Sequence, residues 1–332
     1  MDRDGRLRIG IVGLGKMGLL HATILNSLSS AKVVAICEKK KILVWYGKNL
    51  FPGVAIVERI QDFSSMNLDA VVVSTPIPSH FGIIEALYSI GVPHLFVEKT
   101  LAASGSESLK TCELAQKAGG VNMVGYMARY AVTFRKAKEW MADGAIGGLT
   151  SFSAYAYSSD FIGIEDRSFL RGGVVRDLGC HVIDLAFWYF GELAVETALL
   201  EPRQPANGEG TAHFKANAPN GLKGEFDISW CKEGYRIPDY GLVINGVQGS
   251  IEVSNDSVSI TKDNKRQTWH RVDLNDNVPF MVSAPEYFRE DAGFVDAILN
   301  KSRIETDFIM ASKVDSFIDR VKQEAGTGAT ER

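Results

Sequence analysis

The sequence predicts a two-domain protein, in which an α/β domain with a doubly wound parallel sheet precedes an α+β domain with a large, mainly antiparallel open sheet. Two observations lead to this prediction. Apolar segments of strand length alternate with helical segments up to about residue 127, which is the order that produces a parallel sheet with crossover helices. Beyond that point, segments that alternate apolar and polar residues with a period of two predominate, as in strands with one solvated face. We therefore assign residues 1–127 to the first domain and residues 128–332 to the second.

The overall composition is that of a globular protein and argues against several classes of partner. Of the 332 residues, 45% are apolar and 23% are charged, and the formal net charge is -4. Basic residues are scattered apart from the short run Lys39-Lys40-Lys41, so no nucleic-acid partner is expected. No apolar run approaches the roughly 20 residues of a membrane-spanning helix, so no membrane association is expected.

The cysteines give no indication of a metal site. They lie far apart, without a C-x-x-C or similar spacing, at Cys37, Cys112, Cys180 and Cys231. The charged amino terminus does not resemble a secretion signal. We therefore expect no bound metal and a location in the reducing cytoplasm.

The first expected strand leads directly into a glycine motif. The apolar run 8–12 precedes Gly13, Gly15 and Gly18, and the helix-like segment 19–25 follows. In such a strand–turn–helix the first glycine permits a tight turn, the second lets the backbone approach a pyrophosphate, and the third lets the helix pack closely on the strand. The helix amino terminus then faces the anion. This pattern predicts a Rossmann-type site for a dinucleotide.

The second expected strand supports the same prediction. The apolar run 33–37 ends in Glu38, which lies 20 residues beyond Gly18. A carboxylate at this distance accepts hydrogen bonds from the adenosine ribose hydroxyls. Glu38 favours NAD, because a carboxylate repels the 2′-phosphate of NADP. The three lysines that follow it leave NADP open.

The other segments of the first domain continue the alternation. We expect helices at 40–50, 79–90 and 106–118, and strands at 69–74, 94–98 and 121–126. The strands are short and continuously apolar, as buried parallel strands are. Ser74-Thr75-Pro76 and Lys99-Thr100 follow two of them, so these residues are expected at the carboxyl edge of the sheet, where a cofactor binds.

The second domain is expected to begin with a helix at 133–143 and to continue mainly as strands. The alternating segments are 149–157, 210–216, 221–231, 241–245, 249–253, 257–261 and 267–272. Asp263-Asn264 between the last two is typical of a hairpin turn.

One helix, at about 175–190, interrupts these strands. It carries Asp177, His181 and Asp184 among apolar residues. At about 100° per residue the three side chains share one stripe of an α-helix. Such a stripe must face water, a partner group or a cleft.

With these motifs assembled, the chain resembles the Gfo/Idh/MocA oxidoreductases, the family of glucose-fructose oxidoreductase and inositol dehydrogenase. The resemblance runs from about residue 7 to about residue 320. Its motifs are the glycine loop, Ser74-Thr75-Pro76, His80, Glu98-Lys99, Gly172-Gly173, Asp177-x-x-x-His181 and the segment 246–250. It implies an NAD(P)-dependent oxidoreductase that transfers hydride to or from a secondary alcohol or ketone of a sugar, nucleotide sugar, inositol or related polyol. It also implies a homodimer or homotetramer formed through the second-domain sheet.

The resemblance further implies which residues form the site. Lys99, Asp177 and His181 are the expected catalytic residues, in a substrate cleft beside the nicotinamide. The expected cofactor contacts are Gly13, Gly15, Lys16, Met17, Gly18, Glu38, Ser74, Thr75, Pro76, His80 and Glu98. Tyr126, Arg129 and Arg171 are candidates for substrate contacts, and a structural role stays open for each.

Alcohol oxidation gives these residue types distinct tasks. His181 is the expected proton acceptor, since a free imidazole titrates near pH ~6.5. Lys99 is suited to bonding the reacting oxygen and stabilising negative charge on it. Asp177 either orients His181 or bonds a substrate hydroxyl. Asp184 is expected to be an ion-pair partner or cap within the helix interface.

The sequence departs from the family pattern at two positions. Thr100 replaces the proline of a Glu-Lys-Pro motif, and Ile77 stands where an asparagine often follows Thr-Pro. A cis bond before a residue other than proline costs about 3–4 kcal/mol, so we expect a trans bond between Lys99 and Thr100.

Two other functions remain as alternatives. Some relatives keep the fold and the dinucleotide but regulate by binding a protein partner, and retention of the lysine and the Asp/His pair argues against this. The other alternative is a glycosidase that uses tightly held NAD for transient oxidation, a chemistry found on a similar fold.

Overall fold

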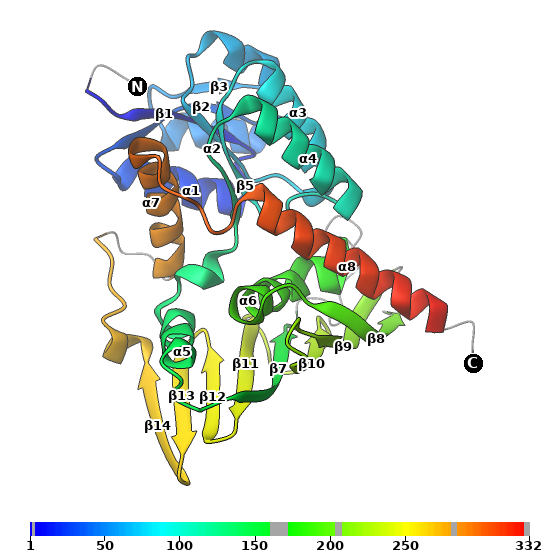
Figure 1. Ribbon diagram of the computed structural model, residues 1–332. Coiled ribbons are helices and arrows are strands. Elements are labelled where there is room, and N and C mark those ends of the chain that lie inside the picture. The colour runs from blue at the N-terminus through cyan, green and yellow to red at the C-terminus, as the bar shows by residue number, and fades with distance from the viewer. Residues whose placement is uncertain (2–3, 160–171, 203–207, 280–283, 329–332) are drawn as a thin grey trace. The chain divides into compact units, whose positions relative to one another are not determined.

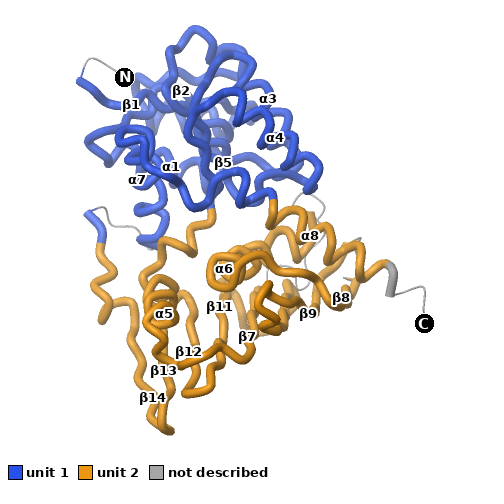
Figure 2. Tube along the Cα trace, in the orientation of Figure 1, with its two compact units in different colours: residues 1–125, 278–312 blue, residues 126–277, 313–332 orange. Residues whose placement is uncertain are grey.

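The computed structural model describes the chain except for residues 2–3, 160–171, 203–207, 280–283 and 329–332. The chain divides into two compact units (Figure 2). Unit 1 contains residues 1–125 and 278–312, and unit 2 contains residues 126–277 and 313–332. The segment 278–312, which the sequence analysis placed in the second domain, therefore clusters with the first. Among the described residues, no helix is both long enough and apolar enough to cross a membrane.

Unit 1 is built on a six-stranded parallel sheet with the order β3-β2-β1-β4-β5-β6. Its strands are β1 (Leu7–Val12), β2 (Ala31–Cys37), β3 (Ala55–Val57), β4 (Ala70–Val73), β5 (His94–Glu98) and β6 (Asn122–Gly125). The strand order reverses between β1 and β4, and this reversal is where a doubly wound sheet opens a crevice for a dinucleotide. The predicted fold class of this part of the chain is confirmed.

Among the described residues, five α-helices lie wholly in unit 1. They are α1 (Lys16–Ser27), α2 (Lys41–Leu50), α3 (His80–Ser89), α4 (Gly105–Ala118) and α7 (Pro285–Asn300). Helix α7 belongs to the returning segment and packs against α1 (Figure 1). The returning segment also covers β6, because the Thr306 carbonyl accepts the Val124 N–H at 2.8 Å.

Unit 2 is built on an eight-stranded sheet with the order β14-β13-β12-β11-β7-β10-β9-β8. Its strands are β7 (Leu149–Tyr157), β8 (Ala194–Pro202), β9 (Glu209–Asn217), β10 (Lys223–Ser229), β11 (Asp239–Gly246), β12 (Gly249–Ser254), β13 (Ser257–Lys262) and β14 (Lys265–His270). The pairs are antiparallel except for β7 with β10, so the predicted mainly antiparallel sheet is confirmed. Asp263 and Asn264 have φ of 50° and 56°, which is the left-handed geometry of the expected hairpin turn.

The period of two in these strands separates a buried face from an open one. Phe152, Ala154 and Ala156 of β7 are buried, and α5 (Val132–Ala142) and α6 (Cys180–Phe190) pack on strands of this sheet (Figure 1). Helix α8 (Phe308–Gly328) brings Phe317 against Phe214, with ring centroids 5.9 Å apart.

Candidate active site

The glycine loop of unit 1 has the geometry that a diphosphate requires. Gly13 has φ of 89°, and a Cβ there would lie 3.0 Å from the Ser74 carbonyl oxygen. A Cβ on Gly18 would lie 2.0 Å from the Gly13 carbonyl oxygen, so the helix lies directly on the loop. A Cβ on Gly15 would meet nothing within 4 Å. Two crowded glycines thus flank one that leaves open space, and α1 begins immediately afterwards at Lys16. The loop fits a dinucleotide diphosphate.

Glu38 is fixed against this loop by backbone donors. Its Oε2 accepts the Leu14 N–H at 2.8 Å, and its Oε1 accepts the N–H groups of Lys39 and Lys40, each at 2.8 Å. A carboxylate has about four acceptor positions, so capacity for a ribose hydroxyl remains. The dinucleotide motif predicts a ribose contact from Glu38, but no sequence signal predicts its bond to the glycine loop.

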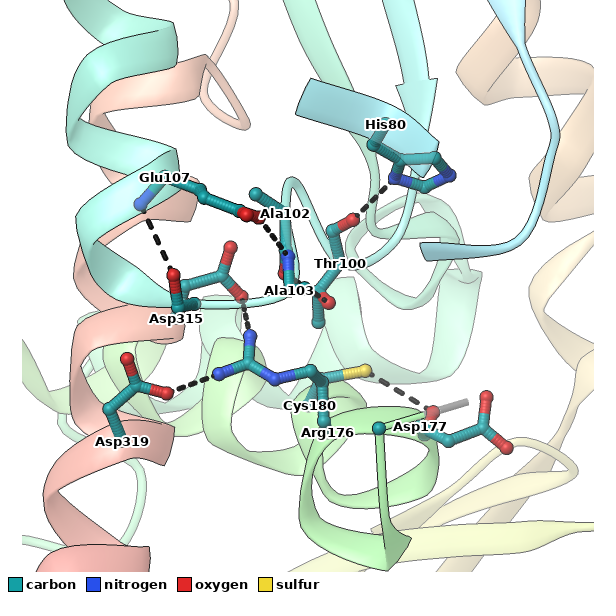
Figure 3. A network of polar contacts seen from close by, with 12 residues as sticks. His80, Thr100, Ala102, Ala103, Glu107, Arg176, Asp177, Cys180, Asp315 and Asp319 are labelled. Carbon is teal, nitrogen blue, oxygen red and sulfur yellow. Dashed lines mark hydrogen bonds and ion pairs between the residues drawn. The ribbon is translucent and has the colours of Figure 1, made fainter. Parts of the chain in front are cut away.

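Two further loops follow β4 and β5 at the same edge of the sheet. Ser74 Oγ donates to the Gly13 carbonyl at 2.8 Å. His80 is fully buried, with Nε2 2.8 Å from the Thr75 carbonyl oxygen. Its Nδ1 lies 2.9 Å from the Thr100 carbonyl oxygen (Figure 3). Its ring thus connects the loop after β4 to the loop after β5.

The remaining expected contacts of unit 1 lie at this edge with different exposures. Lys16 and Pro76 are exposed, Met17, Thr75 and Lys99 are partly exposed, and Glu98 is buried. The Lys99–Thr100 bond is cis, so the expectation of a trans bond was wrong. That expectation counted only the local amide preference and left out the buried contacts of Thr100.

In unit 2, Asp177 and His181 lie on consecutive turns with different geometry. Residues Val175–Gly179 form a π-helical turn, and α6 begins at Cys180. π-Turns within helices occur often at functional sites. Arg176 anchors this turn through the Asp315 carboxylate at 2.9 Å and the Asp319 carboxylate at 2.5 Å, both on α8 (Figure 3).

The His181 ring is held by aromatic stacking. It is 7% exposed and lies parallel to Tyr240 of β11, with centroids 5.3 Å apart and an interplanar angle of 11°. Tyr240 stacks in turn on Phe134, with centroids 5.8 Å apart. Asp177 is partly exposed. The contact of Tyr240 with His181 is not predictable from the sequence, because a tyrosine in an alternating strand does not indicate which side chain it will stack on.

The described candidates for substrate contacts, Arg129 and Tyr126, lie in the protein interior. The Arg129 guanidinium makes a two-point ion pair with Asp184, at 2.8 and 2.7 Å, and both side chains are buried. Asp184 thus has the ion-pair role expected for it. Of the three residues of the stripe, His181 and Asp184 are buried and Asp177 is partly exposed. Tyr126 is fully buried. Arg171 lies outside the described residues. Among the described residues, no group of three or more potential ligands is placed to hold a metal ion.

Curated relatives of this chain include inositol dehydrogenases. Inositol 2-dehydrogenase 4 of Saccharopolyspora erythraea is 29% identical over 60% of this chain and 59% of its own length. Myo-inositol 2-dehydrogenase of Thermotoga maritima is 26% identical over 56% of this chain and 55% of its own. The chain thus spans little more than half the length of these two relatives. Inositol 2-dehydrogenase of Corynebacterium glutamicum is 24% identical over 88% of this chain and 86% of its own length.

Solved structures share the fold over nearly the whole chain. Levoglucosan dehydrogenase in complex with NADH superposes with a TM-score of 0.87 at 20% identity, covering 97% of each chain. An oxidoreductase from Agrobacterium radiobacter in complex with NAD+, L-tartaric acid and magnesium gives a TM-score of 0.84 at 19% identity, again over 97% of each chain. At these identities the similarity establishes the fold.

Family models match both parts of the sequence. Residues 7–126 match the oxidoreductase family with an NAD-binding Rossmann fold, and residues 134–252 match the GFO/IDH/MocA C-terminal domain. This match confirms the predicted NAD-binding Rossmann fold. Since consecutive stretches covering most of the sequence match its two parts, the chain belongs to the Gfo/Idh/MocA family of oxidoreductases.

Proposed function

We propose that this protein is an NAD-dependent dehydrogenase or reductase that interconverts a secondary alcohol and a ketone of a sugar, inositol or related polyol. One observation carries the proposal. The glycine loop follows β1 and Lys99 follows β5, and β1, β4 and β5 are adjacent parallel strands. A dinucleotide cradle and a lysine therefore share the carboxyl edge of one sheet, where doubly wound proteins bind their ligands.

The chain would hold the dinucleotide by the glycine loop and Glu38. A bound dinucleotide would supply the hydride acceptor for the alcohol carbon, or the hydride donor for the ketone. In the oxidative direction the imidazole of His181 takes the hydroxyl proton, while the ammonium of Lys99 bonds the same oxygen and stabilises its negative charge. Asp177 orients His181 or bonds a neighbouring substrate hydroxyl.

The substrate class is supported by the names of similar proteins. Inositol dehydrogenases and a D-apiose dehydrogenase of Rhizobium rhizogenes, 26% identical over 75% of this chain, are among the relatives. The Glu38 carboxylate, held by three N–H groups, supports NAD over NADP. Its fixed negative charge would repel a 2′-phosphate.

Turnover of two variants tests the catalytic assignment. Purified protein is assayed for NADH formation with myo-inositol, D-apiose, levoglucosan and a panel of aldoses. With the best substrate, His181→Ala should lower kcat by about 10²–10⁴, the worth of a positioned base. Lys99→Ala should lower it by about 10²–10³, as loss of an oxyanion donor does. Lys110→Ala, an exposed lysine of α4, is the control and should be unchanged.

Other outcomes distinguish the alternative functions. Near-normal turnover in both variants refutes the assigned roles. Sugar released from a glycoside without net NADH formation indicates the glycosidase. NAD binding without turnover of any substrate, together with a co-purifying protein, indicates the regulator.

We further propose a homodimer or homotetramer that uses the open face of the unit 2 sheet and works in the cytoplasm. The mixture of polar, aromatic and aliphatic side chains on this face supports the first part. Tyr155, Leu199, His213 and Lys215 line a hollow of about 540 Å³ there. The four cysteines, none of them in a disulfide, are compatible with a reducing compartment.

A further inference from the structure

Unit 1 encloses a set of ionisable side chains where α1, β5 and α7 meet. His21 of α1, Glu98 of β5 and Asp291 of α7 are 0%, 8% and 1% exposed. His21 Nδ1 lies 2.8 Å from Asp291 Oδ1, and Nε2 lies 3.0 Å from Glu98 Oε1. Ionised carboxylates only accept hydrogen bonds, so the ring donates from both nitrogens and is an imidazolium.

The surrounding charges favour the ionised forms of His21 and Glu98, whereas burial raises the pKa of Asp291. Burial opposes protonation of His21, but Asp291 and Glu98 outweigh it and hold the pKa of the imidazole well above its usual value. Burial alone would raise the pKa of Glu98, whereas the hydrogen bond and charge of His21, followed by the charge of Lys99, lower it. The neighbouring titratable groups of α7 are Glu286 and Glu290.

Glu98 links His21 to the backbone of Lys99 through its two carboxylate oxygens. Its Oε2 accepts the backbone N–H of Lys99 at 3.1 Å, while its Oε1 is bound to His21. The imidazole is itself fixed by two aromatic rings. Its centroid lies 4.9 Å from that of Phe96 and 6.3 Å from that of Tyr287. Neither Glu98 nor His21 can rotate without breaking a buried hydrogen bond.

The same contacts reach the glycine loop through α1. This helix begins at Lys16, directly after Gly15, and carries His21 in its second turn. Buried ion pairs are weak contributors to stability, since apolar packing of the same volume often serves as well. Their better-attested role is to fix one arrangement among several.

We infer that Asp291, His21 and Glu98 form a positioning chain that fixes the backbone of Lys99 relative to α1, the helix that follows the glycine loop. The inference rests on the proposed function, because it takes Lys99 as the group that bonds the reacting oxygen. The three side chains act through Lys99 and do not touch substrate. A displacement of about 1 Å in a reacting group lowers the rate by a factor on the order of 10². Residues that hold Lys99 in position therefore preserve the reaction rate.

Kinetics of combined variants test the inference. His21→Gln and Asp291→Asn should each lower kcat about 10- to 100-fold, with KM for NAD+ within about threefold. Ile24→Ala is the control, because Ile24 is a fully buried apolar residue of the same helix, and it should lower thermal stability with little change in kcat. In a Lys99→Ala background, His21→Gln should cause no further loss of kcat. An additive loss would mean that His21 acts independently of Lys99, and this would overturn the inference.

A second measurement needs no substrate. In protein labelled with [15N]lysine, the Lys99 amide should exchange with solvent at least tenfold faster in His21→Gln than in wild type, and unchanged in Ile24→Ala. In [15N]histidine-labelled protein both ring nitrogens of His21 should be protonated at pH 8. Equal exchange in all three proteins, or a neutral His21, would overturn the inference. Near-normal turnover of Lys99→Ala would instead overturn the proposed function and leave the exchange result standing.

Discussion

At the scale of single residues, buried charged side chains of this protein pair with partners from distant segments of the chain. Arg129 was named as a candidate substrate contact, yet its partner is Asp184, 55 residues away. His21 acquires its role from Asp291, 270 residues away. No local pattern carries such pairings, because they depend on how the helices pack.

The pair of Arg129 and Asp184 provides a stability prediction. Arg129→Met removes the ion-pair partner of the fully buried Asp184 carboxylate, so the free energy of unfolding should fall by about 3–5 kcal/mol. The double variant Arg129→Met, Asp184→Leu replaces both charges and should recover most of that loss. Urea unfolding followed by tryptophan fluorescence measures both. If Arg129→Met lowers the free energy of unfolding by less than about 1 kcal/mol, the predicted contribution of the ion pair to stability is wrong.

Glu290 of α7 predicts a dependence of stability on pH. Its side chain is 0% exposed, and neither carboxyl oxygen has a hydrogen-bond partner among the described residues. Burial, followed by the charges of Glu98 and Asp291, raises the pKa of Glu290 well above its usual value. As the pH rises above about 4.3, the unfolded chain releases this proton while the folded chain retains it, so the free energy of unfolding falls.

Glu290→Met removes this contribution. The variant should gain stability over wild type by about 1–3 kcal/mol at pH 8, and the gain should shrink towards pH 5. Thermal unfolding at several pH values is the measurement, with Glu85→Met on the exposed face of α3 as the control. Parallel curves for Glu290→Met and wild type would contradict the raised pKa.

At the scale of elements, periodicity located most helices and strands, and β5 and β7 have the expected bounds residue for residue. Strands β3 and β8 and helices α7 and α8 were not predicted. In α7 the buried positions include Glu286, Glu290 and Asp291. These charged residues interrupt the apolar pattern by which the buried face of a helix is predicted. The π-turn at Val175–Gly179 was also missed, because its anchor, Arg176, binds carboxylates on α8.

The glycine loop provides the prediction at this scale. Gly15→Ala adds a methyl group where nothing lies within 4 Å, and the φ of -71° suits alanine. Stability without cofactor should therefore change by less than about 0.5 kcal/mol. The Kd for NADH should nevertheless rise at least tenfold, because the diphosphate must approach this backbone. Fluorescence titration with NADH measures the affinity.

Two other glycines serve as comparisons for this experiment. Gly18→Ala should lose both stability and NADH affinity, since its Cβ would lie 2.0 Å from the Gly13 carbonyl oxygen. Gly82→Ala, in α3 with nothing within 4 Å, should bind NADH normally and gain about 0.5–1 kcal/mol of stability. Unaltered affinity in Gly15→Ala would refute the assignment of the diphosphate to this loop.

At the scale of the whole molecule, the sequence predicted a parallel sheet followed by a mainly antiparallel sheet. It did not predict that a later segment of the chain returns to the first unit. Residues 278–312 return to unit 1, and such a return is invisible to an analysis that reads composition and period along the chain. The assignment of a cofactor domain at 1–127 and a substrate domain at 128–332 thus stays a prediction about function. The contact structure divides the chain differently.

The open face of the unit 2 sheet provides the prediction at this scale. Leu199 of β8 is 49% exposed and lines the hollow on this face. Leu199→Glu should shift the protein from a dimer or tetramer towards a smaller species, because an interface would have to bury the new charge. Light scattering coupled to size-exclusion chromatography measures the mass. Ile42→Glu on α2 of unit 1, where Ile42 is 60% exposed, is the control. A monomeric wild type would contradict the proposal.

The return of α7 to the first unit limits how this protein can be cut and recombined. A fragment that stops near residue 127 would contain the whole six-stranded sheet but would lack the helix that covers α1 and supplies Asp291. Such a fragment would leave His21 without one of its counter-ions and an apolar helix surface in water. During synthesis, the amino-terminal unit has to wait for residues near 312 to leave the ribosome before its packing is complete. A chimaera with another oxidoreductase should therefore exchange residues 278–312 together with the amino-terminal half.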